Sequence, residues 1–494
     1  MPSMIKSIQY FNEESIKKIG ELEHDFHSAP TDIASYVMGI TAVMQELGLK
    51  IISETLEDLD KCLRDSPRRK RDWLVEKNVT KQLITSLGAV NFKKTLFTRR
   101  DGTEMRYLLD DLMHFEEHER MTDDAVAKML QEAAETSYRR GGEEASPGAG
   151  VSKETVKDKL HALRFPEDRK EPAKKKEVKN LYIDADEDHA SLQFREHRGD
   201  LETNDNGYKN NCQMTKLVYI YEGIEKEGPE NKRRRLINPH YFSGTHEGSD
   251  ANRKFWNDIY AYIDRNYDID KMDHLYLNAD GGAWISAGLK ETAGVEGVLD
   301  EFHLMKYMMK IVRHMQDSDS DARSELKKVI SNGTKKEFID LVEKIDGYAG
   351  TESEHRHVAE GRDYILSNWK AARTRLAERK TVVGCSAEGH VSHVLASRMS
   401  SRPMGWSRTG ANKMAQLRAY YYNKGDMLEL ARFQKAELPV AAGAENEILS
   451  MADIQASERR SASDIGKYVD KITHTLGSEF NKTWLNNFDW DKFI

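Results

Sequence analysis

The sequence predicts an α/β protein in which a strand-rich region lies between helical regions. Between residues 181 and 299, short runs of β-branched and aromatic residues are bounded by turn-forming residues, a pattern typical of strands. Before and after this region, most clearly over 303–380, apolar residues recur every three or four positions, as on the buried face of a helix. With 494 residues, the chain is long enough for roughly two to four domains.

The composition argues against a membrane protein and against a disulfide-stapled one. Hydrophobic residues make up 38% and charged residues 32% of the chain, and no apolar run approaches the roughly 18 residues of a spanning helix. The first residues lack the basic and apolar segments of an export signal. The three cysteines are too far apart in sequence to suggest a disulfide framework. We expect a cytoplasmic protein with no membrane partner.

Charge is distributed unevenly along the N-terminal part. The whole chain has a formal net charge of -8, and residues 1–60 carry 4 Lys and Arg against 11 Asp and Glu. Residues 61–106 carry 13 against 5, which makes a locally basic segment. Because a polyanion senses the local charge, the acidic total does not exclude DNA binding. We expect a helical region at 1–60 and a basic DNA-binding region at 61–163.

Two short helices in the basic region resemble a helix-turn-helix. The first is expected from Thr122 to about Arg139, broken by Gly141 and Gly142, and the second begins after Ser152 as its N-cap. The N-terminal turns of such a second helix enter the DNA major groove. An ordinary helical hairpin with a solvated lysine face explains the pattern equally well. If the motif is present, the residues that face DNA are Lys153, Thr155 and Lys157.

The stretch 164–180 contains two prolines, eleven charged residues and few apolar ones, which indicates an exposed linker. After it, the pattern predicts strands at 181–186, 190–194, 216–224, 275–280 and 295–299, with a helix near 255–263 before the fourth strand. Three strands, a helix, a strand, a helical stretch and a strand follow one another in the ribonuclease H-like fold.

This element order divides the rest of the chain. We expect the first part of a ribonuclease H-like core at 181–302, a helical insertion at 303–380, the second part of the core at 381–420 and a helical C-terminal region at 421–494.

Acidic residues follow two of the expected strands. Asp184, Asp186 and Asp188 cluster at the end of the first, and Asp280 ends the strand at 275–280, followed by Gly281. Carboxylates from separate segments suit Mg²⁺, which prefers oxygen ligands and supports phosphodiester chemistry. Acidic residues are also common turn formers after strands, so neither group alone is decisive. Strict alternation puts Asp184 and Asp186 on one face and does not choose between them.

Five runs in this part of the chain resemble a known family. They are 182–189 (YIDADEDH), 279–285 (ADGGAWI), 299–304 (LDEFHL), 384–393 (GCSAEGHVSH) and 397–407 (SRMSSRPMGWS). Together they resemble the ISLre-type insertion-sequence transposases, a family long described as uncharacterised and similar to the mutator-like DDE transposases. The resemblance covers roughly residues 88–420.

The resemblance implies a DDE-type DNA transposase of a bacterial insertion sequence. It implies that Asp186, Asp280 and Glu388 hold Mg²⁺ or Mn²⁺, cut the element ends and join them to target DNA, with Asp184 as a further candidate ligand. Ser386 is expected to cap the helix that carries Glu388 in its first turn. The implied partners are double-stranded DNA and further copies of the chain, because two element ends must be brought together.

Further residues near this site are candidates for supporting parts. Glu301 competes with Glu388 as the third acid, and Asp300 and His303 are expected to support the ligands, although His303 could equally be a core histidine. Beside Glu388 lies a basic run that could clamp phosphates and stack on a base, or form a solvated face around a core tryptophan. Its candidate DNA-binding residues are Arg398, Arg402, Trp406 and Arg408.

Two other functions stay open at this level. One is a transposase-derived DNA-binding protein without catalysis, and the other is a metal-dependent nuclease without joining activity. The phosphate-binding motifs GxxxxGK[ST] and GxGxxG do not occur, so we expect no nucleotide cofactor.

Overall fold

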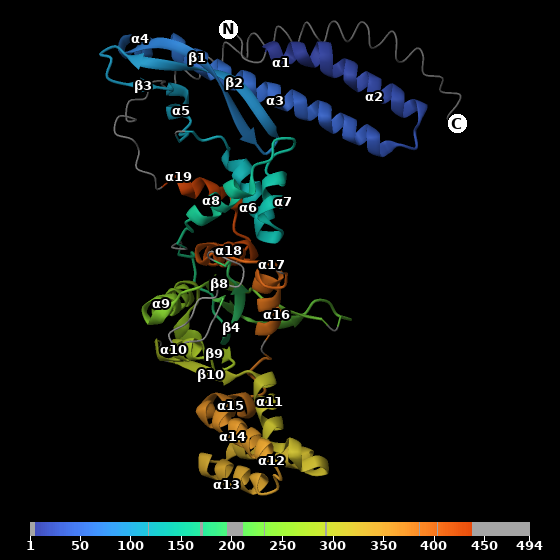
Figure 1. The fold of residues 1–494 in the computed structure, drawn as a ribbon, viewed down its shortest axis with the longest axis vertical. Helices are drawn as coiled ribbons and strands as arrows, with labels where there is room; N and C mark the ends of the chain where they lie inside the picture. The colour runs from blue at the N-terminus through green and yellow to red at the C-terminus, as the bar shows by residue number, and fades with distance from the viewer. Residues whose placement is uncertain are drawn as a thin grey trace. The chain divides into compact units, whose positions relative to one another are not determined.

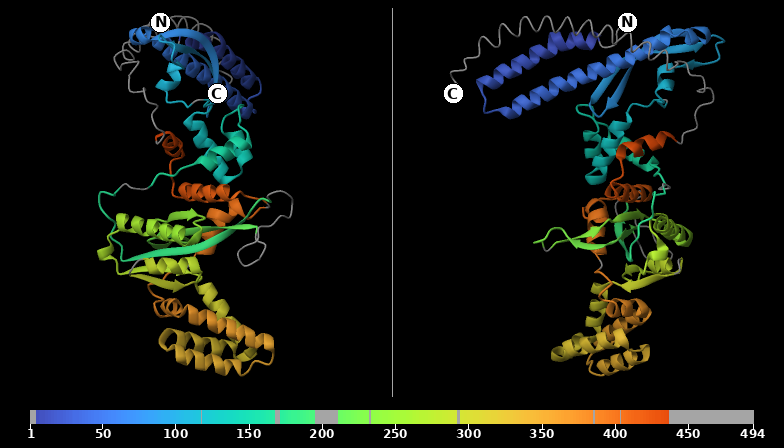
Figure 2. Two further views of the ribbon diagram at one scale, coloured as in Figure 1. Left: turned by 60° about the vertical axis from the view of Figure 1, so that its left-hand side comes forward. Right: turned by 180° about the vertical axis from the view of Figure 1, so that it is seen from behind.

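The computed structural model describes residues 5–436 except 117, 168–170, 195–210, 232, 292–293, 385 and 403. The expected mixture of helices and strands is confirmed. The chain forms two compact units, shown in Figures 1 and 2. The first contains Met1–Ala133, Tyr138–Val156 and the chain from Ala431, and the second contains Ala134–Ser137 and Lys157–Leu430. Most of the expected C-terminal region, 437–494, lies outside the described residues.

The first unit begins with a helical hairpin. Helices α1 (Ile5–Tyr10), η1 (Phe11–Ser15) and α2 (Ile16–Ser28) lead into α3 (Ile33–Asp65), which lies alongside α2 (Figure 1). Asp32 caps α3 by accepting a hydrogen bond from the Ser35 N–H. Helix α3 therefore continues through the boundary that we expected at residue 60, and α4 (Pro67–Asp72) follows it.

A three-stranded antiparallel sheet follows, which the sequence reading missed. Strands β1 (Trp73–Thr85), β2 (Gly88–Arg99) and β3 (Met105–Arg106) are arranged in the order β1-β2-β3. The sheet packs on α3 and on α5 (Leu108–Leu112). The core that joins these elements contains Leu56, Leu63, Leu83, Val90, Phe92, Phe97, Leu108 and Leu109.

Three helices then pack together: α6 (Asp123–Glu135), α7 (Tyr138–Glu144) and α8 (Lys153–Ala162). We expected Gly141 and Gly142 to break a helix. Instead, both lie buried inside α7. A Cβ atom at Gly141 would lie 2.8 Å from the Met129 carbonyl of α6, and one at Gly142 would overlap the Val151 carbonyl. The glycines are therefore needed for close packing of α7 against both neighbours.

The second unit is built on a five-stranded mixed sheet with the order β10-β9-β4-β5-β8. Strands β4 (Asn180–Ser191), β5 (Cys212–Tyr221) and β8 (His240–Gly244) pair antiparallel, whereas β9 (His274–Ala279) and β10 (Val295–Leu299) run parallel to β4. A small hairpin, β6 (Gly223–Lys226) and β7 (Arg234–Ile237), extends from this sheet.

The three successive strands expected before the first helix of this region were partly wrong, since β4, β5, β6, β7 and β8 all precede α9. The expected second strand at 190–194 begins inside β4, which continues unbroken to Ser191. The third strand of the sheet is β8, which the sequence reading did not predict. Its sequence, HYFSG, does not alternate clearly between apolar and polar residues.

The two faces of the sheet differ in chemistry. Helices α9 (Gly248–Asn266) and α10 (Ala283–Glu291) cover the face to which Leu181, Ile183 and Ala185 point. The alternate residues of β4, among them Asp184 and Asp186, face the other side because successive side chains of a strand alternate. This second face carries the candidate site.

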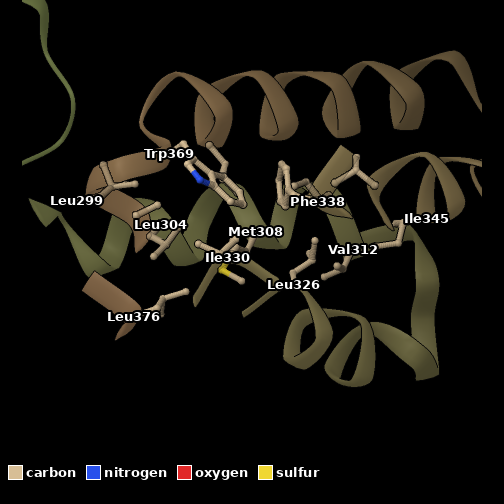
Figure 3. Packing of buried hydrophobic residues seen from close by; sticks show 14 of the residues in the cluster. Leu299, Leu304, Met308, Val312, Leu326, Ile330, Phe338, Ile345, Trp369 and Leu376 are labelled. Atoms are coloured by element: carbon tan, nitrogen blue, oxygen red, sulfur yellow. The ribbon is translucent and has the colours of Figure 1, made fainter. Parts of the chain in front are cut away.

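A helical insertion follows β10, as expected for 303–380. It comprises α11 (Glu301–Val312), η3 (Arg313–Ser318), α12 (Asp319–Asn332), α13 (Lys335–Asp346), α14 (Glu352–Ser367) and α15 (Trp369–Ala377). Figure 3 shows its own hydrophobic core, in which Met308, Ile330, Phe338 and Trp369 gather. Capping boxes start α13 and α14, at Thr334 and Thr351.

The chain then returns to the sheet through α16 (Ala387–Val391), η4 (Ser392–Ala396) and α17 (Ser397–Met399), followed by α18 (Arg408–Tyr422) and α19 (Met427–Ala436). Figure 1 shows α16 alongside β4, which it contacts. None of the helices in the described ranges is both long and apolar enough to cross a bilayer.

Candidate functional site

Asp186 and Asp280 lie on neighbouring parallel strands. The ladder between β4 and β9 pairs Asp184 with Asn278, so Asp186 and Asp280 follow two residues further along each chain. Asp280 comes directly after β9, as expected, but Asp186 lies within β4, which continues to Ser191 in pairing with β5. The two aspartates are therefore neighbours at the end of β9, beyond which β4 continues without pairing to β9.

The electrostatics of Asp186 reflect this arrangement. Burial, together with the negative charges of Asp280 and Glu187, raises the pKa of Asp186 to about 6, against the lowering effects of the Glu187 N–H and of His303. The Glu187 N–H donates to Asp186 Oδ1 at 2.8 Å. A cation bound beside Asp186 would offset the unfavourable effect of its burial and of the neighbouring negative charge of Asp280.

The turn after β9 holds Asp280 in place. The Gly282 N–H donates to Asp280 Oδ1 at 2.9 Å, and the Tyr364 hydroxyl of α14 donates to the Asp280 carbonyl. Gly281 has φ of +95°, and a Cβ atom there would lie 2.6 Å from Asn368 Oδ1. Only glycine fits this position without strain, so the helical insertion and the turn pack directly against each other.

Asp184 is completely buried and accepts four hydrogen bonds. Its Oδ1 accepts from Asn278 Nδ2 at 2.6 Å and from the Tyr221 hydroxyl at 3.1 Å. Its Oδ2 accepts from the Tyr219 hydroxyl at 2.7 Å and from the Ser386 N–H at 3.1 Å. Burial raises the pKa of Asp184, and the four donated bonds act in the opposite direction. Both oxygens are occupied, and the bonds connect β4 to β5, β9 and the start of α16.

A buried arginine continues this network. Arg375 of α15, 3% exposed, donates from Nη2 to Asn278 Oδ1 at 2.7 Å, from Nε to the Leu299 carbonyl at 2.8 Å, and from Nη1 to the Val383 carbonyl at 2.8 Å. The side chain of Asn278 thus lies between the Asp184 carboxylate and the Arg375 guanidinium. A buried negative and a buried positive charge are joined through one amide.

Asp300 and His303 form a pair at the end of β10. Asp300 is the N-cap of α11, and its Oδ2 accepts from the His303 N–H at 3.1 Å and lies 2.9 Å from His303 Nδ1. His303 also acts on the charge of Asp186. The imidazole is therefore oriented by Asp300 and lies near the two aspartates, rather than in the hydrophobic core.

Glu388 lies in the first turn of α16, as expected, with its side chain exposed. Ser386 occupies the N-cap position but makes no side-chain cap bond; its hydroxyl lies 2.9 Å from the Tyr219 hydroxyl. Within the described ranges, Asp186, Asp280 and Glu388 do not form a group whose ligand atoms all lie within 4.8 Å of one another. The group that meets this distance is His274, Glu296 and Glu378.

Two of the expected DNA-binding residues beside Glu388 are buried. Trp406 is 5% exposed and donates from Nε1 to the Met399 carbonyl at 2.8 Å, so its ring is not available to stack on a base. Arg398 is 4% exposed and lies over the Trp406 ring, 4.9 Å from its centroid. Their burial contradicts the expectation that either residue contacts DNA and fits the alternative of a core tryptophan.

The other two residues of this run are exposed. Arg408 donates from Nη1 to Gln213 Oε1 at 2.8 Å and to Glu247 Oε1 at 3.1 Å, and Arg402 is exposed. On α8, Ser152 caps the helix by accepting from the Thr155 N–H at 3.1 Å. Lys153 Nζ lies 3.8 Å from Glu154 Oε1, and Lys157 Nζ lies 3.1 Å from Asp158 Oδ1; both carboxylates are exposed.

The sequence reading missed four members of the buried network, Tyr219, Tyr221, Asn278 and Arg375. A signal existed for three of them, because Tyr219 and Tyr221 alternate on an expected strand and Asn278 precedes Asp280 by two residues on the same face. Arg375 gave no signal among the other basic residues of its helix.

A model of the family described as "Uncharacterised protein family (UPF0236)" matches residues 31–437. Two proteins of Caldanaerobacter subterraneus subsp. tengcongensis, each named a UPF0236 protein, are similar over most of the chain. One is 33% identical over 442 residues, which cover 90% of this chain and 88% of the relative, and its name joins eleven locus designations of one strain. The other is 32% identical over 463 residues, which cover 94% and 93%.

Among solved structures, a chain of the "Drosophila P element transposase strand transfer complex" is matched with 8% identity over 61% of this chain and 80% of that chain. The TM-score is 0.20. A score at that level indicates neither a shared fold nor a shared activity.

Proposed function

The chain belongs to the uncharacterised protein family UPF0236, and because that name assigns no activity, we propose a function from the site: a DDE-type DNA transposase of the ISLre-type insertion sequences. In this proposal the enzyme cuts the ends of its element and joins them to target DNA in a metal-dependent reaction.

The observation that carries the proposal is the pairing of Asp186 with Asp280. Asp186 lies on β4 and Asp280 directly follows the adjacent parallel strand β9 at the same level, and burial together with the charge of Asp280 raises the pKa of Asp186. Such a pair is suited to a divalent cation, because the cation offsets the repulsion. The Asp184 network then holds the start of α16, with Glu388 two residues later, against the same face of the sheet.

The sheet supports the same conclusion. Three antiparallel strands followed by two strands parallel to the first, with order β10-β9-β4-β5-β8, is the arrangement expected of a ribonuclease H-like core. The helical insertion between β10 and α16 accounts for the 108 residues that separate Asp280 from Glu388.

We assign the metal ligands to Asp186, Asp280 and Glu388, and leave Asp184 out because its oxygens already accept four hydrogen bonds. Oxygen donors of this kind fit Mg²⁺ or Mn²⁺. When bound, the ions would activate the attacking oxygen and stabilise the leaving one. Asp300 orients His303 toward the pair, where the imidazole can hydrogen-bond to a ligand or to substrate. The exposed Glu388 side chain is placed to turn inward when the ions and DNA are bound.

The relatives provide independent support. A single protein name that joins eleven loci of one strain indicates one sequence repeated in that genome. Two further relatives of the same strain have names that join four and two loci. Repetition of this kind is what a self-copying element produces. We extend to this chain the expectation of double-stranded DNA as partner, with the chain acting as a homo-oligomer.

The test is a cleavage and strand-transfer assay with the full chain, Mg²⁺ and DNA that carries both element ends. We expect the wild type to nick and join, and Asp280→Asn and Glu388→Gln each to reduce both steps by at least about 1,000-fold while DNA binding persists. Glu301→Gln is the matched control, since Glu301 is an exposed acid in the first turn of α11 and should leave activity unchanged.

Other outcomes select other functions. Binding without cleavage by the wild type would favour a DNA-binding protein that has lost catalysis. Cleavage without joining would favour a nuclease. Full activity of the Glu388→Gln variant together with loss in Glu301→Gln would overturn the assignment of the third acid.

A further inference from the structure

A second group of metal-ligating side chains lies away from the candidate catalytic site. His274 begins β9, Glu296 lies on the neighbouring edge strand β10, and Glu378 directly follows α15. Each residue offers one ligand atom, and these three atoms all lie within 4.8 Å of one another. All three side chains are half-buried. His274 Nδ1 is 2.7 Å from Glu296 Oε1.

The group is far from Asp280. His274 is the first residue of β9 and Asp280 follows its last, so six residue steps separate them, roughly 20 Å along a strand. An ion bound at His274 would therefore be a different ion from one held by Asp186 and Asp280.

Neighbouring groups hold the three side chains in position. The buried Tyr276 ring stacks on the His274 imidazole at a centroid distance of 5.2 Å and an interplanar angle of 10°. The Tyr276 hydroxyl donates to Glu378 Oε2 at 2.8 Å and lies 3.1 Å from the Thr381 hydroxyl. One tyrosine thus orients both the histidine and one carboxylate, in the way that outer groups orient metal ligands.

The charge of the group is unbalanced. Two carboxylates lie close together, and in the part of the chain that the structure describes no Lys or Arg pairs with Glu296 or Glu378 within 4.0 Å. A cation bound between the two carboxylates would offset their repulsion. A nitrogen and two carboxylate oxygens favour Zn²⁺ over Mg²⁺, because Mg²⁺ strongly prefers oxygen ligands alone.

We propose that His274, Glu296 and Glu378 bind a Zn²⁺ ion, with water as the fourth ligand. The ion joins β9 and β10 to the exit of the helical insertion. Glu378 lies ten residues before Glu388, so the ion fixes the point from which the chain returns to the candidate catalytic face. This site is independent of the transposase proposal, since metal binding is measured without DNA.

The experiment is a zinc titration of the full chain after removal of metals by a chelator, with excess Mg²⁺ present to occupy the Asp186 and Asp280 carboxylates. We expect one tightly bound Zn²⁺ per chain by calorimetry, and a rise in the thermal unfolding temperature when Zn²⁺ is added. Glu296→Gln and Glu378→Gln, which keep the side-chain shape, should each weaken this binding by at least about 10- to 100-fold.

Two variants serve as controls and should retain the bound ion. Asp280→Asn changes the other site, and His355→Ala removes an exposed histidine that pairs with Asp346 at 2.9 Å without a third ligand. Cobalt in place of zinc should give visible absorption bands in the wild type that are absent in Glu296→Gln.

The proposal is overturned if the wild type binds no Zn²⁺, if neither glutamine variant weakens binding, or if Asp280→Asn abolishes it.

Discussion

Asp184 and Asp186 lie two residues apart on one face of β4, yet their surroundings give them different chemistry. Each oxygen of Asp184 accepts two hydrogen bonds, whereas Asp186 is placed against the charge of Asp280. Alternation along the strand correctly put both residues on one face. It could not distinguish them, because the groups that do so come from distant positions, Tyr219, Asn278 and Ser386.

Asp186→Asn is expected to stabilise the metal-free protein. Burial and the neighbouring negative charges raise the folded-state pKa of Asp186 to about 6, from the ordinary value of about 3.9 for an Asp carboxyl. A raised carboxyl pKa gives stability that is fully present below the unfolded pKa and is lost as pH rises through the folded pKa. Above pH 6 the wild type has lost this contribution, and the uncharged asparagine has not. We expect a gain of about 1–3 kcal/mol at pH 8, measured by urea unfolding with a chelator present.

Two further measurements would show that the carboxyl charge of Asp186 causes the gain in stability. The advantage of Asp186→Asn should shrink as pH falls from 6 to 4, where the wild-type carboxyl becomes protonated. Asp184→Asn should instead destabilise by about 1–3 kcal/mol, because its amide cannot accept all four bonds donated to the carboxylate. An Asp186→Asn variant that is less stable than the wild type at pH 8 would contradict the assigned electrostatics.

At the scale of elements, the sequence predicts helices and strands well where one face of the element is apolar and the other polar. The insertion helices and the β9 and β10 strands have such faces and were expected close to their observed positions. The β1–β2 hairpin was missed because lysines occupy its buried side. Lys94 is buried, pairs with Asp110 and lies 3.7 Å from the centroid of the Tyr107 ring. A bulge between Val75 and Lys77 also shifts the alternation.

Part of the positive charge at 61–106 is therefore used inside the first unit, and α8 becomes the better candidate for contact with DNA. Among the residues that the structure describes, Lys153 and Lys157 form ion pairs with the adjacent exposed acids Glu154 and Asp158, and such pairs are weak. We expect Lys153→Ala with Lys157→Ala to reduce affinity for element-end DNA and to lower the slope of log affinity against log salt by roughly 2, without a change in stability. Fluorescence anisotropy across a salt series measures both quantities.

The control is Lys174→Ala with Lys175→Ala, which removes the same charge from two exposed lysines outside α8. If both double variants weaken binding equally, α8 has no special part in recognition and the three-helix cluster is an ordinary helical packing unit.

At the scale of the whole second unit, one buried polar network connects elements that are far apart in sequence. Asp184 bonds to β5, β9 and the start of α16, and Arg375 bonds to β9, to β10 and to the Val383 carbonyl. The sequence predicted the insertion as a separate helical block and gave no indication of this link, because its members are single polar residues spread from 184 to 386. The structure thereby makes the insertion part of the support for the candidate site.

Arg375→Met tests this link. The substitution leaves the Leu299 and Val383 carbonyls and the Asn278 side chain without their donor, and it removes the positive charge that faces Asp184 across the amide. Loss of one member of a buried charged network is costly, and we expect destabilisation of about 3–5 kcal/mol in urea unfolding.

Arg379→Met is the matched control. Arg379 is exposed and lies 3.7 Å from Glu301, so its loss should change stability by less than about 0.5 kcal/mol. Because the network positions both Asn278, beside Asp280, and Ser386, beside Glu388, Arg375→Met should also reduce cleavage while the affinity for DNA stays unchanged. An Arg375→Met variant as stable as Arg379→Met would mean that the bonds made by Arg375 are not needed to hold the insertion against the sheet.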